Sequence, residues 1–224
     1  MYVPPYFPEP VVVRDAAADA PYDVRRKFIQ RVIVGHAATV GVATAIGFFA
    51  HFTIDFRISS FALLVMLLIH CLARKLANST YPEKLIQIVL LPFVLVACGV
   101  VGSGLSQRDW PVWVFPVAVT GGTVYAMLAG RDFSFLGHFG ASIGSIFLIL
   151  FAKPWLPAFV PGTYPQAIIV GGIASFYVSY DLAMILRRRK ANEAVSGICD
   201  LYGDVLNITT YAPRVIAHWK KFNI

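Results

Sequence analysis

SFYVSYDLAMILRRRKANEAVSGICDLYGDVLN, residues 175–207, is the stretch that decides the fold. It runs from the end of a long apolar segment through the basic loop Arg187 to Lys190 into a second, more polar segment that contains Asp200 and Asp204. Unpaired polar groups are costly inside hydrocarbon. The polar segment can therefore cross a membrane only if other helices surround it, and we expect it to be central.

The composition supports a membrane protein. Hydrophobic residues make up 58% of the 224 residues, charged residues only 14%, and the mean hydropathy is +0.68. A soluble domain carries roughly 25% charged residues. The net charge of +7 does not indicate nucleic acid, because the basic residues flank apolar runs as they do in membrane proteins. We expect the lipid bilayer as a partner and exclude a soluble enzyme and a nucleic-acid binder.

Six apolar runs are candidates for membrane crossing, which needs about 20 mostly apolar residues. They lie at about 30–52, 58–74, 84–105, 110–129, 133–152 and 165–186, and the polar seventh segment lies at about 193–219. The sequence therefore predicts an all-α polytopic membrane protein. Seven transmembrane helices are expected, with six surrounding the polar C-terminal helix.

Two regions differ in composition. Residues 1–27 are Pro-rich at their start and are expected to form an extended N-terminal arm, and residues 28–224 are expected to form the seven-helix membrane domain. The arm is either a mobile tail or a docking arm for other membrane-protein subunits. Lys and Arg concentrate on the N-terminal side of the predicted spans, which places the N-terminus on the cytoplasmic or matrix-equivalent side. Basic residues at the C-terminal end leave a re-entrant last segment open.

Ionisable residues inside the predicted spans are the candidates for function, because they are rare and costly there. Asp181 lies near the end of the sixth span, Asp200 and Asp204 share one face of the seventh, and Asn207 extends that face. Closely held carboxylates share a proton, and their oxygens suit Ca²⁺. The alternative is that these acids pair with buried Arg and only hold helices together. Arg74, at the end of the second span, either reaches the interface or pairs with Asp181.

His36 and His138 lie well inside predicted spans. We expect hydrogen-bonded packing roles for both, with His36 as the best candidate for a second proton-linked group. The sequence has no nucleophile elbow, Gly-rich phosphate loop or haem-type histidine pair. We therefore expect no enzyme activity and no organic cofactor.

The C-terminal third resembles the transmembrane BAX inhibitor motif family, also called the Bax inhibitor-1 family. Tyr180 and Asp181 match its sixth-helix signature, and Leu201, Tyr202, Asp204 and Asn207 match its last-helix signature. RDFSFLGHF, residues 131–139, is a weaker match to the start of the fifth helix. The resemblance implies six helices around a central seventh and a pH-sensitive Ca²⁺ leak. It further implies Asp181 and Asp204 as proton and Ca²⁺ sensor and Arg74 as the latch of the closed state, with Asp200 and Asn207 in support.

Two functions follow as competing hypotheses. The first is a pH-sensitive calcium leak channel of this family, some of whose members suppress cell death. The second is a non-transporting accessory subunit of a larger membrane complex, suggested by the Pro-rich arm and by the unusual ITTYAPRVIAHW, residues 208–219. An H⁺-coupled transporter is a weaker third hypothesis. The mitochondrial inner membrane, the endoplasmic reticulum or Golgi and the bacterial plasma membrane all remain open as locations.

Overall fold

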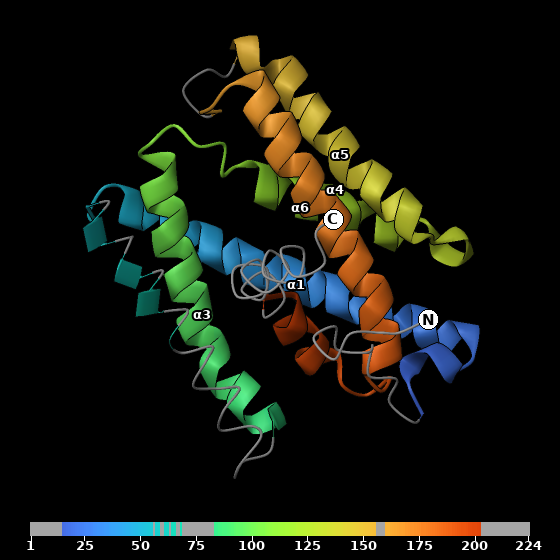
Figure 1. Cartoon of the computed structure of the whole chain (residues 1–224). Helices are drawn as coiled ribbons and strands as arrows, with labels where there is room; N and C mark the ends of the chain where they lie inside the picture. Colours follow the sequence, from blue (N-terminus) through green and yellow to red (C-terminus); the bar gives the residue numbers. More distant parts are fainter. Residues whose placement is uncertain are drawn as a thin grey trace, which may run out of the picture.

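The described part of the chain is helical throughout its regular structure. Figure 1 shows the computed structural model, which describes residues 15–55, 83–155 and 160–202 together with the helical positions 57–58, 61–62, 64–65 and 68. Five long helices carry the architecture: α1 (Tyr22–His51), α3 (Glu83–Ser106), α4 (Val114–Leu128), α5 (Phe135–Ala152) and α6 (Tyr164–Arg188). Short 3-10 turns, η1 (Ala17–Asp19), η2 (Gly130–Asp132) and η3 (Lys153–Trp155), lie at their ends. Residues 194–202 are helical as well.

Within the residues that the structure describes, four helical stretches are long and apolar enough to cross a membrane. They are Tyr22–His51, Ile88–Ser106, Phe135–Trp155 and Tyr164–Arg188. Helix α4 has only 15 residues and spans roughly 22 Å, less than the hydrocarbon core of about 30 Å. The prediction of a helical membrane protein is confirmed. The predicted spans at 30–52, 84–105, 133–152 and 165–186 each fall on one of these helices, and the span at 110–129 was too long.

The predicted boundary of the N-terminal arm was wrong. Helix α1 begins at Tyr22, inside the segment 1–27 that was expected to be extended, and residues 17–19 already form a 3-10 turn. Pro21 occupies the N-cap of α1. A run of Lys and Arg then forms the first two turns, because these side chains are good helix formers that reach toward the headgroups. The part of the arm before residue 15 lies outside the described residues.

One end of the bundle collects the start of α1, the end of α4 and the end of α6. The Ala17 amide donates to the Arg189 carbonyl at 2.8 Å, and the Tyr22 hydroxyl donates to the Arg131 carbonyl. In Figure 1 the start of α1, the start of α5 and the end of α6 lie on the same side of the molecule. The basic residues of these helix ends therefore share one membrane face.

The opposite end collects the end of α1 and the end of α3. The Gln107 side-chain amide donates to the carbonyls of His51 at 3.2 Å and of Ile54 at 2.8 Å. The Trp113 indole nitrogen donates to the Pro161 carbonyl at 3.0 Å, which joins the start of α4 to the segment before α6. From α3 to α6 the helices therefore alternate between the two ends, as short connections require, whereas α1 and α3 both end at this one.

Small residues let the helices of each pair approach closely. A Cβ built on Gly99 of α3 would lie 2.7 Å from the Ala43 carbonyl oxygen of α1, and one built on Gly121 of α4 would lie 2.8 Å from the Ala141 carbonyl oxygen of α5. Without a hydrophobic drive between helices in lipid, such close backbone packing supplies much of their association. The α1–α3 and α4–α5 pairs are built on these glycines.

The helix at residues 194–202 packs between α1 and α6. Gly197 lies against Val32 of α1 and Ile185 of α6, and Ile198 fills the space beside Gly35. The Tyr202 hydroxyl donates to Thr39 Oγ1 at 2.8 Å. The start of the predicted seventh segment is thus enclosed by other helices. Its remainder, residues 203–224, lies outside the described residues, so the number of crossings stays a prediction.

Gly99→Ala tests the α1–α3 contact. The new methyl group must displace backbone, and overpacking of this kind costs about 1–3 kcal/mol. We expect a lower melting temperature in detergent. Gly144→Ala is the matched control, since nothing described lies within 4 Å of its added Cβ. Equal melting temperatures for the two variants would contradict the contact.

Candidate functional site

Helix α6 carries the first candidate acid, and its start is well defined. Thr163 and Gln166 form a capping box, in which each side chain accepts from the other residue's backbone amide, and Pro165 follows in the first turn. This arrangement satisfies amides that a helix start leaves unpaired. The helix then holds its register to Arg188 and places Asp181 near the basic end.

Asp181 is deeply buried, with 3% of its surface exposed. Its neighbours in sequence, Leu182 and Ile185, belong to the core cluster shared with Phe28, Ile29, Val32 and Ile33 of α1. A carboxylate in such surroundings is costly and is more common at functional positions than in plain packing. The structure therefore keeps Asp181 as the strongest single candidate among the described acids.

Asp200 is occupied by an ion pair. Arg189 Nε donates to Asp200 Oδ2 and Arg189 Nη2 donates to Asp200 Oδ1, both at 2.6 Å, and the two side chains are only 16% and 15% exposed. Two parallel donors on one carboxylate are the strongest geometry an ion pair can take. Of the two roles considered for the acids, Asp200 therefore has the second: it pairs with an Arg. The pair holds the helix at 194–202 against the end of α6.

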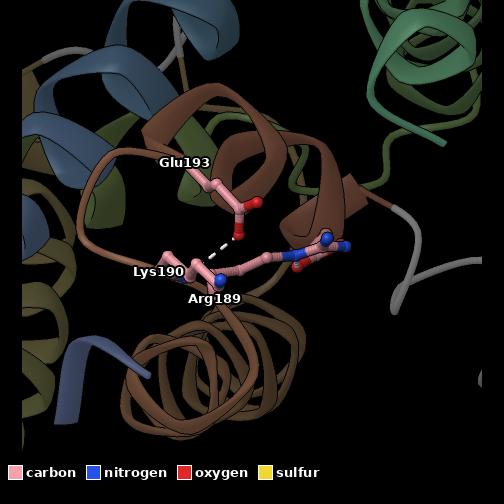
Figure 2. Close-up of polar contacts among 4 residues, drawn as sticks. Arg189, Lys190 and Glu193 are labelled. Atoms are coloured by element: carbon pink, nitrogen blue, oxygen red, sulfur yellow. Dashed lines mark hydrogen bonds and ion pairs between the residues drawn. The ribbon is translucent and has the colours of Figure 1, made fainter. Parts of the chain in front are cut away.

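Arg189, Lys190 and Glu193 order the turn between α6 and the helix at 194–202 (Figure 2). The Lys190 amide donates to Glu193 Oε2 at 3.0 Å, which closes the turn before the following helix, while the Arg189 carbonyl accepts from the Ala17 amide. Arg189 thus joins three segments through its backbone and its side chain. A basic loop was predicted here, and the specific pairing was not.

A small cavity of about 30 Å³ lies where α1, α4, α5 and α6 meet. Two histidines face it, His36 from α1 and His138 from α5. Hydroxyl-bearing residues of three helices contribute as well: Thr123, Ser142 and Ser175. The described helices therefore gather side chains that can hydrogen-bond in the middle of the bundle, and Leu182, next to Asp181, lines the same cavity.

His138 has the hydrogen-bonded packing role that was expected, whereas the buried His36 Nδ1 has no hydrogen-bond partner among the described residues. His138 Nδ1 and Ser179 Oγ of α6 share a hydrogen bond of 2.9 Å, and a Cβ on Gly122 would collide with the His138 ring. His36 meets the Tyr202 ring edge-on, with ring centroids 5.3 Å apart. The sequence analysis did not select Ser175 and Ser179, although two serines four residues apart on an apolar helix mark one polar face.

Three predicted site residues, Arg74, Asp204 and Asn207, lie outside the described residues. The pairing of Asp181 with Asp204, or with Arg74, stays a prediction. Among the described residues, no group of three His, Cys, Asp or Glu side chains lies close enough to hold a metal ion. A calcium site at Asp181 would depend on ligands from the rest of the chain.

The long apolar helices and the enclosed polar residues define a helical membrane protein. No protein-family model matches the chain, and neither do the curated proteins or the solved structures with which it was compared. The function is therefore argued from the chain's own residues.

Arg189→Met tests the ion pair. It leaves the Asp200 carboxylate half-enclosed without its two donors, and losing hydrogen bonds to a charged group costs about 1.5–3 kcal/mol. We expect a clearly lower melting temperature. Arg187→Met is the matched control, because Arg187 is exposed two residues earlier. Equal loss in both variants would contradict a specific role for Arg189.

Proposed function

We propose that this protein is a pH-sensitive calcium leak channel of the Bax inhibitor-1 family, with seven transmembrane helices. The single observation that carries the proposal is the burial of Asp181 inside a membrane-crossing helix, at 3% exposure, in the position where the sequence resembles the family's sensor. Asp204, two residues beyond the described helix at 194–202, would be its partner. The packing of that helix against α1 and α6 supports a central last helix.

The proposed mechanism is competition for one set of oxygens. A carboxylate pair in a dry site holds one proton in common, and Ca²⁺ binds when that proton leaves. Arg74 would hold the closed state by pairing with Asp181. Asp200 was expected to support ion binding. In the proposed mechanism it instead holds the last helix beside α6, because Arg189 neutralises its charge. The N-terminus would lie on the cytoplasmic or matrix side.

Calcium flux into liposomes that contain the purified protein tests the proposal. We expect flux that changes with pH between about pH 5 and 8, and we expect Asp181→Asn to remove that change because the amide cannot ionise. Asp109→Asn is the matched control. Asp109 is exposed and has a φ of 58°, a conformation that Asn also adopts. A pH response that persists in Asp181→Asn would refute the sensor assignment.

A second function is an accessory subunit of a larger membrane complex. The Arg189–Asp200 pair supports it, because a paired carboxylate can hold two helices together without binding an ion. Extraction in mild detergent followed by native electrophoresis separates the two functions. A stand-alone channel migrates as a small species, whereas a subunit migrates with a large assembly. Migration with a large assembly, together with absent flux from folded protein, would replace the channel proposal with this one.

A further inference from the structure

One face of α1 is exposed along its whole length. Its residues follow the three- and four-residue spacing of a single helix stripe, and all of them are exposed: Val24, Lys27, Arg31, Val34, Ala38, Gly41, Val42, Ala45 and Phe49. Helix α3, helix α4 and the helix at 194–202 contact other faces of α1, through Ala43, Gln30 and Val32 respectively. In a membrane the stripe faces lipid.

Two cations lie at one end of this otherwise apolar stripe. Lys27 and Arg31 are one turn apart, which is about 6 Å along the axis, so both can reach one phosphate group. Within the described ranges neither side chain forms an ion pair, not even with Asp23, which lies one turn before Lys27. Both cations are therefore available to an outside anion.

The length of the apolar part of the stripe matches one acyl chain of a phospholipid. From Arg31 to Val42 the helix rises about 16 Å, close to half of the hydrocarbon core of about 30 Å, which is the length available to one acyl chain. Tyr22, at the same end, is exposed and is bonded through its hydroxyl to the Arg131 carbonyl, as suits an aromatic side chain at headgroup level. The cations thus lie where a headgroup ends and the acyl chain begins.

We propose that this face of α1 is a binding site for an anionic phospholipid. Lys27 and Arg31 hold the phosphate, and the apolar residues from Val34 to Val42 contact the acyl chain. Basic helix ends at a membrane face attract anionic lipids, each cation contributing separately. Arg26, half-buried beside them, adds positive potential without facing the stripe. The site does not depend on whether the protein conducts calcium.

Lipid retention by the full chain tests this site. The protein is reconstituted in mixed phosphatidylcholine and phosphatidylglycerol, extracted in mild detergent, and its bound lipids are counted by native mass spectrometry. Wild type should retain phosphatidylglycerol in preference to phosphatidylcholine. The double variant Lys27→Gln with Arg31→Gln should lose that preference by about tenfold or more. Raised salt should weaken the preference of the wild type.

Two variants make the result specific. Arg57→Gln with Arg108→Gln removes the same charge at the opposite end of the bundle and should keep the preference, whereas Lys27→Arg with Arg31→Lys keeps the cations and should behave as wild type. Because Lys27 and Arg31 are exposed, the variant Lys27→Arg with Arg31→Lys should also keep the melting temperature of the wild type. Equal loss in the two charge-removing variants, or retained preference without Lys27 and Arg31, would overturn the site.

Discussion

Hydrocarbon offers no hydrogen-bond partner to a polar side chain, and the arrangement of this chain follows from that constraint. The polar residues of α5 and α6 turn toward each other, as in the His138–Ser179 bond, and Tyr202 of the last described helix finds Thr39 of α1. Near the membrane face, Asp200 is closed by the two donors of Arg189. The lipid-facing surfaces are left to apolar side chains, with cations only near the ends.

Close contact between helix backbones stabilises the bundle in addition to the polar pairs. The α1–α3 pair depends on Gly99 and the α4–α5 pair on Gly121, and the Gln30 side chain of α1 joins the two pairs by donating to the Ala126 carbonyl. Helix α6 and the helix at 194–202 then cover the junction. The buried acid Asp181 lies on α6 in this last layer, and the small cavity beside the two histidines lies where α6 meets α1, α4 and α5.

Hydropathy and length were enough to locate most of the membrane helices, because about 20 apolar residues have few other stable arrangements. The start of α1 was missed because Arg25 to Lys27 look like a loop by hydropathy, yet they form helix readily at a headgroup boundary. The partner of Asp200 was also beyond prediction: spacing places it on a face with Asp204, while only the turn at 189–193 brings Arg189 to it. Gly99 and Gly144 likewise look alike in sequence, and only the packing separates them.

The hydrogen bond from Ala17 to the Arg189 carbonyl has a consequence for biosynthesis. The ribosome releases Ala17 first, yet the Arg189 carbonyl that accepts its amide emerges only after α1, α3, α4, α5 and α6 have been made. The N-terminal turn must therefore wait at the membrane surface, and its amide stays with water until α6 arrives. A nascent chain that stops before residue 189 therefore leaves the Ala17 amide without this acceptor, and the N-terminal turn is fixed late in synthesis.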